Sequence, residues 1–196
     1  AHRQCPAAAV GGIPDMARPG ETGFLFSGDD PVEAARPGLP RQTGRIRRHI
    51  SADFNEVPDL VKRVQECRSL PTSRLALEFL ILTAARTKEV LEATWAEIDE
   101  VKKLWVLPPE RTKTGLIHRV PLTTRMEEIL HEAQDLSTGS KLIFVGPATG
   151  RPLSYNTLLH VLQKRVGSTA TVHGFRSSFK DWASETTTFP NEVSEM

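Results

Sequence analysis

Three separated groups of basic residues have the types and positions needed to bind a phosphate. Arg86 stands at the break between two apolar helical patterns, where the backbone amides of the second helix begin and favour an anion. Lys113 lies in the turn between two short strand-like runs. The section from Val101 to Arg125 around it holds six Lys or Arg and one Asp or Glu. A cationic hairpin tip of this kind suits a polyanion.

The third group is His173 and Arg176, which are three residues apart and therefore share one face of a helix. Phe175, Phe179 and Trp182 occupy another face, which we expect to be buried. The polar pair then lies at the rim of a packed face, where a site is both held in place and reachable.

Each group also has a simpler interpretation. Arg86 and Glu89 have the i,i+3 spacing of a surface ion pair worth a few tenths of a kcal/mol. Lys113 fits a solvated turn, and His173 and Arg176 fit a histidine at the edge of the core beside an arginine that extends to solvent. The local patterns leave these alternatives open.

Hydrophobic spacing predicts the elements that must position these residues. Leu75 to Ala85 is apolar nearly all round and predicts a buried central helix. Other helices are expected at 57–67, 90–98, 124–135, 155–166 and 173–186, and strands at 104–107, 117–122 and 142–145. The fold class is therefore mainly α with a small antiparallel β-sheet (α+β).

Composition excludes several classes of protein. With 39% hydrophobic and 25% charged residues, the 196-residue chain is not disordered, collagen-like or a disulfide scaffold. Its net charge of +1 excludes a strongly polycationic nucleic-acid coat. Cys5 and Cys67 form no zinc-ligand or disulfide motif, so neither a zinc site nor a disulfide framework is expected, and a reducing, cytoplasmic setting fits best. The longest apolar stretch is shorter than the ~20 residues of a membrane span, which predicts a soluble protein without membrane contact.

The sequence changes character near residue 50. Residues 1–45 are dense in Gly and Pro and lack a lasting helical or strand period, and a basic run without acids extends from Arg41 to His49. Residues 1–50 are therefore expected to be an arm or fusion remnant with a basic linker, followed by one domain at 51–196. The first residue is not Met and no signal peptide is evident, which suggests an internal fragment.

Three segments in order resemble the tyrosine recombinases, the phage-type integrases, over 51–196. They are LEFLILTAARTKEVLEATWAEID, ERTKTGLIHRVPL and TVHGFRSSFKDWASE. The resemblance implies the catalytic-domain fold of that family and site-specific DNA recombination or integration by strand breakage and rejoining. It implies double-stranded DNA and other recombinase protomers in a synaptic assembly as partners, with no metal or ATP.

The same resemblance implies roles for individual residues. Arg86 and Arg176 match the arginines that clamp the phosphate, and His173 matches the histidine that assists proton transfer on the attacking side. Lys113 matches the hairpin lysine that protonates the departing 5′-oxygen, and Glu89 matches a supporting residue. The residues expected to contact DNA are Arg111, Lys113, Arg119 and Arg125.

One departure from the family concerns the nucleophile. The family places a second His or Trp and then the attacking Tyr after the segment that here reads FPNEVSEM, where this sequence stops. The only tyrosine, Tyr155, precedes the His173 segment and is not assigned this role. The chain is therefore expected to be a catalytic-domain fragment without its nucleophile. The alternative is a non-catalytic DNA-binding or regulatory fragment of the same fold.

Residues 1–40 carry a separate resemblance. The segment AVGGIPDMARPGETGFLFSGDDP is similar to part of the retaining glycosyltransferases with two Rossmann-like domains. The acidic motif that helps to form their sugar-nucleotide site is absent. We therefore interpret this segment as a remnant, and sugar-nucleotide binding through it is a distant third function.

Overall fold

The computed structural model describes residues 49–137, 139–147 and 151–189. Predictions for the arm, for the basic run before His49 and for the glycosyltransferase-like segment lie outside the described residues. In chain order the elements are η2 (Phe54–Glu56), α2 (Val57–Glu66), α3 (Pro71–Thr83), α4 (Thr87–Leu91), η3 (Trp95–Glu97), β1 (Ile98–Asp99), β2 (Leu104–Leu107), η4 (Pro109–Arg111), β3 (His118–Pro121), α5 (Thr124–Ser137), α6 (Tyr155–His160), η5 (Val161–Arg165) and α7 (Gly174–Thr186).

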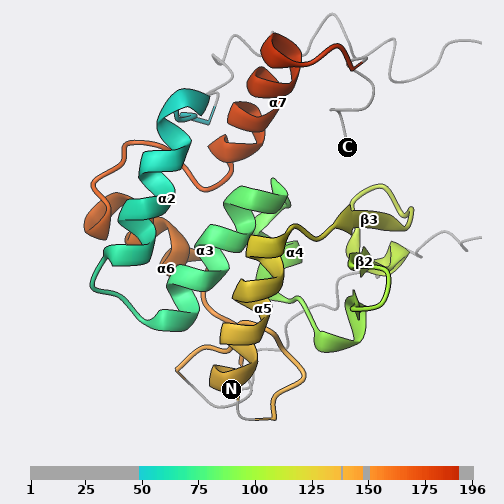
Figure 1. Cartoon of the computed structure of the whole chain (residues 1–196). Helices are drawn as coiled ribbons and strands as arrows, with labels where there is room; N and C mark the ends of the chain where they lie inside the picture. Colours follow the sequence, from blue (N-terminus) through green and yellow to red (C-terminus); the bar gives the residue numbers. More distant parts are fainter. Residues whose placement is uncertain (1–48, 138, 148–150, 190–196) are drawn as a thin grey trace, which may run out of the picture. The chain divides into compact units, whose positions relative to one another are not determined.

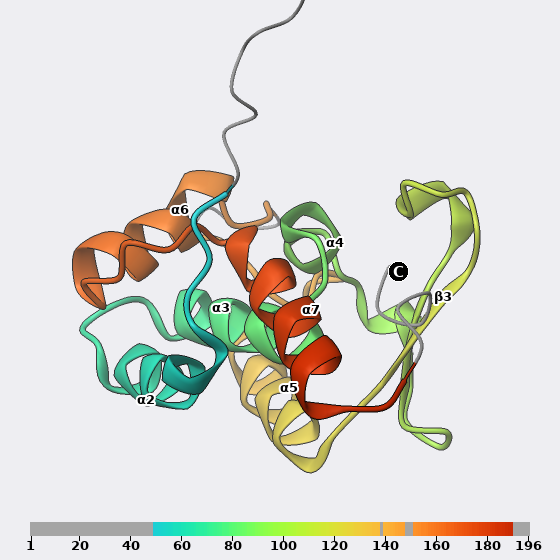
Figure 2. The same cartoon turned by 90° about the horizontal axis from the view of Figure 1, so that it is seen from above.

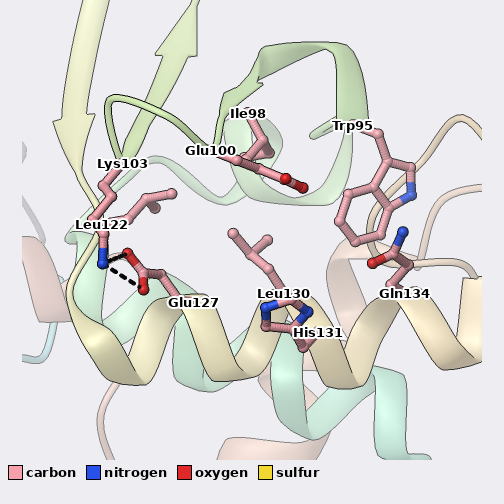
Figure 3. Close-up of a pocket in the computed structure, with 9 residues that line it drawn as sticks. All are labelled: Trp95, Ile98, Glu100, Lys103, Leu122, Glu127, Leu130, His131 and Gln134. Carbon is pink, nitrogen blue, oxygen red and sulfur yellow. Dashed lines mark hydrogen bonds and ion pairs between the residues drawn. The ribbon is translucent and has the colours of Figure 1, made fainter.

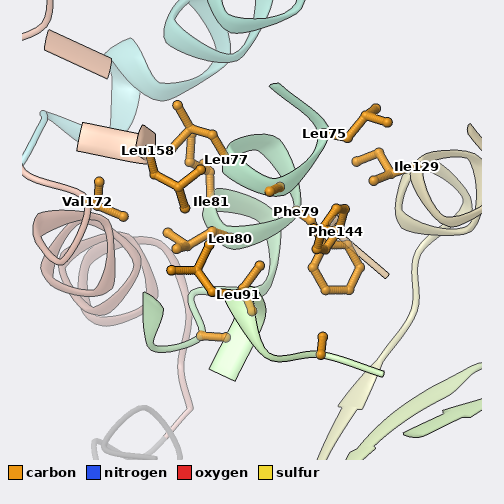
Figure 4. Close-up of a cluster of buried hydrophobic side chains, with 14 of the residues drawn as sticks. Leu75, Leu77, Phe79, Leu80, Ile81, Leu91, Ile129, Phe144, Leu158 and Val172 are labelled. Carbon is orange, nitrogen blue, oxygen red and sulfur yellow. The ribbon is translucent and has the colours of Figure 1, made fainter. Parts of the chain in front are cut away.

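Helix α3 lies in the middle of the other helices, with α2, α5 and α7 around it (Figures 1 and 2). Its side chains pack on several sides. Leu77 lies beside Leu158 of α6, and Phe79 lies 5.5 Å from Phe144 and 5.3 Å from Trp105, centroid to centroid (Figure 4). Burying each such side chain stabilises the fold by about 1.5–3 kcal/mol. The predicted buried central helix is confirmed.

The other long helical patterns are also confirmed. Elements α2, α5 and α7 match their predicted ranges to within a few residues, and the range 155–166 contains α6 followed by the π-helical turn η5. Within the described ranges, no helix combines the length and the apolar character needed to cross a membrane.

The predicted small sheet is also confirmed. It has the order β1-β2-β3 with antiparallel neighbours, of which β2 and β3 are labelled in Figure 1. Leu107 of β2 pairs with His118 of β3. Residues alternate along β2, so that Trp105 and Leu107 are buried against the helices. The connection that contains Lys113 therefore joins β2 to β3, and buried Trp105 anchors this part of the sheet to the helices.

The predicted helix over 90–98 is wrong in extent, because α4 ends at Leu91. Thr94 instead forms an isolated bridge with Leu142, and the main-chain oxygen of Ala93 accepts a 2.9 Å hydrogen bond from Ile143. Ile98 then begins strand β1, which was not predicted. β-branched and aromatic residues favour extended structure where such partners exist.

The predicted strand over 142–145 is also wrong. Leu142 pairs with Thr94, whereas Val145 pairs with Pro152, so the two ends of this run have different partners. Proline has no N–H to extend a ladder. Only isolated bridges form.

The turn between β1 and β2 is fixed to α5. Lys103 and Glu127 form an ion pair with atoms 2.9 Å apart, and the Lys103 main-chain oxygen accepts a 2.8 Å hydrogen bond from Leu122 (Figure 3). A cavity of about 140 Å³ lies beside this pair, between Trp95 and His131. None of the predicted catalytic residues lines the cavity, so it is separate from the candidate site.

Candidate phosphate-binding site

Arg86 is held by the carboxylate of Glu89 at the start of α4. The Arg86 backbone N–H and its Nη1 each donate a 2.8 Å hydrogen bond, one to each Glu89 carboxylate oxygen. The Glu89 side chain is 5% exposed and the Arg86 side chain 32% exposed. The i,i+3 pair is thus present, but its carboxylate is buried, and it orients a guanidinium that remains accessible.

Arg176 joins α7 to the end of α3. Its Nη1 donates a 2.6 Å hydrogen bond to the main-chain oxygen of Ala84. Ala84 has a left-handed backbone with φ of 48°, so the chain turns sharply between α3 and Arg86. A non-glycine residue in this conformation is under strain, which the surrounding packing has to offset.

The two guanidiniums therefore lie close enough to affect each other. Burial lowers the pKa of Arg176, the charge of Arg86 lowers it further, and the Glu89 carboxylate opposes both effects. Two cations gathered beside one buried carboxylate leave a net positive site that suits an anion.

His173 is the residue before α7, and its side chain is exposed. Its ring centroid lies 4.5 Å from that of His49, with the ring planes at 60°. Partial burial lowers the pKa of His173, and His49, Arg176 and Arg86 lower it further. The neutral imidazole is therefore favoured beside the two arginines.

His118 is a further residue of the candidate phosphate-binding site, and the sequence did not lead us to expect it there. It is half-buried at the start of β3. Burial lowers its pKa, the Glu89 carboxylate raises it, and Arg176 and Arg86 lower it. The available signal was strand alternation, which places His118 on the same face as buried Val120.

Lys113 lies in the exposed connection between η4 and β3. Gly115 supplies a positive φ of 68°, and Thr112 Oγ1 donates a 2.8 Å hydrogen bond to the Leu116 main-chain oxygen across the turn. Among the described residues, no hydrogen bond or ion pair holds the Lys113 ammonium. The structure thus brings Arg86, His173 and Arg176 together and leaves Lys113 on a separate exposed turn.

Arg111 is held inside the protein. Its Nη1 contacts the Glu97 carboxylate, and its Nη2 donates a 2.6 Å hydrogen bond to the Glu89 main-chain oxygen. The Arg111 side chain is 17% exposed, and Glu97 also accepts a 2.9 Å hydrogen bond from Trp105 Nε1. The residue predicted to contact DNA instead ties the base of the Lys113 connection to α4.

Arg125 is likewise engaged with carboxylates. Its guanidinium donates to both oxygens of Glu78, at 2.7 and 3.0 Å, and also contacts Glu128 and Glu132. These acids raise the pKa of Arg125. Because three carboxylates offset its charge, this placement does not support a DNA contact. Arg119, by contrast, is exposed on β3.

Residues 51–195 match the sequence model of the Phage integrase family. Two relatives come from Escherichia coli (strain K12). Prophage integrase IntZ is 31% identical over 153 residues, which cover 77% of this chain and 35% of the relative. Putative protein IntB is 30% identical over 148 residues, which cover 67% of this chain and 37% of the relative. The chain thus spans just over a third of the length of these relatives.

Solved structures have a similar fold. A lambda integrase dimer bound to a COC′ core site superposes with a TM-score of 0.60 at 19% identity, covering 81% of this chain and 60% of that chain. A lambda integrase tetramer bound to a Holliday junction gives a TM-score of 0.60 at 20% identity, with 84% and 53% covered. These likenesses confirm the fold that the motifs implied.

Proposed function

Because the chain belongs to the phage integrase family, we propose that it contributes the phosphate-activating site of a tyrosine recombinase. The reaction is site-specific DNA recombination or integration by breakage and rejoining of strands, and its substrate is double-stranded DNA. A DNA substrate of this kind implies a cytoplasmic setting. Other protomers take part with it in a synaptic assembly. Lambda integrase, which has a similar fold, has been solved as a dimer bound to a COC′ core site and as a tetramer bound to a Holliday junction.

The convergence of Arg86 and Arg176 carries this proposal. Negative charge grows on the two nonbridging oxygens when a phosphodiester is attacked. Planar guanidiniums that are already in place stabilise that charge without having to rearrange. Glu89 orients Arg86, and the Ala84 main-chain oxygen orients Arg176, so both are held before any phosphate arrives.

Two further groups supply proton transfers. A tyrosine hydroxyl attacks the phosphorus, forming a phosphotyrosyl bond, while the bond to the 5′-oxygen breaks. His173 takes the hydroxyl proton, and Lys113 donates a proton to the departing 5′-oxygen. Each transfer of this kind contributes about 10²–10⁴ in rate. Tyr155, exposed at the start of α6, is not assigned as the nucleophile.

The exposed turn between η4 and β3 contributes the DNA contacts. Lys113 is exposed in this turn and Arg119 is exposed on the adjoining strand β3, whereas the inward-facing Arg111 fixes the turn to the helices. Arg111 therefore acts in this proposal by positioning Lys113 rather than by binding a phosphate itself.

A nicked suicide DNA substrate tests the proposed reaction. The chain itself should form no covalent adduct, whereas a version extended at its C-terminal end to supply an attacking tyrosine should form one. Arg176→Ala in the extended version should abolish the adduct, and Lys62→Ala, which removes an exposed cation of α2, should not.

Two outcomes would contradict parts of this assignment. An adduct on Tyr155 would show that Tyr155 is the nucleophile and that leaving it unassigned was wrong. An extended version that binds cognate DNA without forming an adduct would favour the non-catalytic DNA-binding alternative.

A further inference from the structure

Residues 50–52 are fastened to the beginning of α7. The Ile50 main-chain oxygen accepts hydrogen bonds from Thr171, at 2.9 Å from its backbone N–H and 3.2 Å from its Oγ1. Ser178 Oγ donates a 2.5 Å hydrogen bond to the Ala52 main-chain oxygen. The segment that precedes η2 is thus bound at two points, on either side of His173 in the sequence.

Gly174 makes this close approach possible. A Cβ atom at position 174 would lie 2.2 Å from the Ile50 main-chain oxygen and 2.9 Å from Ser51 Cα. Both are backbone atoms, which have no rotamer that would relieve the overlap. Glycine is therefore required at position 174, next to His173. The surface that holds residues 50–52, which we call the seat, is formed by Thr171, Gly174 and Ser178.

The seated segment brings His49 to His173. Their ring centroids are 4.5 Å apart, and the planes are tilted by 60°. His173 is also within electrostatic reach of Arg86 from the start of α4 and of Arg176 from α7. The His49 ring thus packs against His173, the catalytic histidine proposed above, although the two residues are more than 100 positions apart in the sequence.

We propose that His49 is a positioning residue of the phosphate site, which packs on the His173 imidazole. This inference rests on the proposed function, in which His173 has to accept a proton from the attacking hydroxyl. An imidazole that already carries a proton is unable to do so. A second imidazole whose ring centroid lies 4.5 Å away disfavours the state in which both rings are protonated, since two adjacent cations repel each other.

His49→Phe separates the electrostatic role from simple packing. Phenylalanine keeps an aromatic ring on His173 but removes the ionisable group. We expect the NMR titration midpoint of the His173 ring to move to higher pH in His49→Phe, and to do so in His49→Ala as well. His131→Phe is the matched control, because His131 lies on α5 beside the Lys103–Glu127 pair and should leave His173 unchanged. A His173 midpoint that is the same in His49→Phe and wild type would overturn the proposal.

Gly174→Ala tests the seat by a second route. The new Cβ should displace residues 50–52, so His173 should titrate as in His49→Ala while circular dichroism confirms that the variant is folded. If Gly174→Ala does not fold, the His49→Phe result still decides. A folded Gly174→Ala whose His173 titrates as in wild type would contradict the proposed seating.

Inorganic phosphate distinguishes failure of this inference from failure of the proposed function. In the wild-type chain, phosphate should shift the side-chain NMR signals of both Arg86 and Arg176. If it does not, while His173 still responds to His49→Phe, the phosphate site is wrong and the coupling of the histidines stands. If phosphate binds but the His173 titration midpoint is unchanged in His49→Phe, the inference about His49 is wrong and the phosphate site stands.

Discussion

The Arg176 guanidinium donates a 2.6 Å hydrogen bond to the main-chain oxygen of Ala84. This contact joins α7 to the left-handed end of α3, two residues before Arg86. The sharp turn at Ala84 directs the chain into α4, where the buried Glu89 carboxylate receives Arg86. The two arginines are therefore placed by main-chain geometry and by one carboxylate.

Arg176→Lys should impair cleavage although it conserves charge. A lysine ammonium is a point charge that lacks the planar fork needed to contact the Ala84 oxygen and a phosphate together. Cleavage of a suicide substrate by the extended version should fall by about 10²-fold or more. Arg119→Lys, an equivalent exchange on exposed β3, should leave the rate near wild type. Equal rates for the two variants would show that Arg176 is not a clamp.

Arg111→Ala should destabilise the fold by about 3 kcal/mol, because it leaves the buried Glu97 carboxylate without its cation. Arg119→Ala, which removes an exposed arginine from the same hairpin, should change the free energy of unfolding by less than about 0.5 kcal/mol. Urea denaturation of both variants measures the difference. A loss for Arg111→Ala no greater than that for Arg119→Ala would contradict the interior role.

Lys113 and Arg119 should contribute to the salt dependence of DNA binding. Each phosphate contact releases counterions, so Lys113→Ala and Arg119→Ala should each reduce the slope of log K against log salt by about 0.9. Lys62→Ala on α2 serves as the control and should leave the slope unchanged. A wild-type affinity that does not respond to salt would refute the proposed surface.

Stability should fall as the pH drops below about 6.5. The pKa values of His118 and His173 are lowered in the folded chain, so the unfolded chain binds more protons in this range. Proton uptake then favours unfolding, and the stability present above pH 6.5 is progressively lost. The variant His118→Phe with His173→Phe should show a shallower decline in urea midpoint with pH than wild type. An identical decline would assign the effect to other groups.

The long hydrophobic patterns predicted most of the fold. The hydrophobic patterns of α2, α3 and α5 each extend over ten or more residues, and neighbouring helices bury their apolar faces. The errors fall where pairing partners come from distant segments. Thr94 pairs with Leu142, and nothing in the local sequence of either residue reveals the other.

The candidate site was predicted only in part, again because some of its contacts come from segments that are distant in the sequence. The motifs identified Arg86, His173 and Arg176, which the structure brings together. Strand alternation was the signal available for His118, and no local pattern indicated His49 as a member of the site. Arg111 and Arg125 carried the charge expected of DNA contacts. Their carboxylate partners, Glu97 and Glu78, lie on other elements, so local charge counting missed both ion pairs.

A double-mutant cycle on Arg86 and Arg176 tests the central claim most directly. Binding of a short DNA duplex by the chain is measured for Arg86→Ala, Arg176→Ala and the double variant, with Arg86→Ala and Lys62→Ala as the control cycle. If both arginines hold one phosphate, their losses of binding free energy should differ from additivity by about 0.5 kcal/mol or more, while the control cycle remains additive. Additive losses for Arg86 and Arg176 would contradict a shared phosphate site.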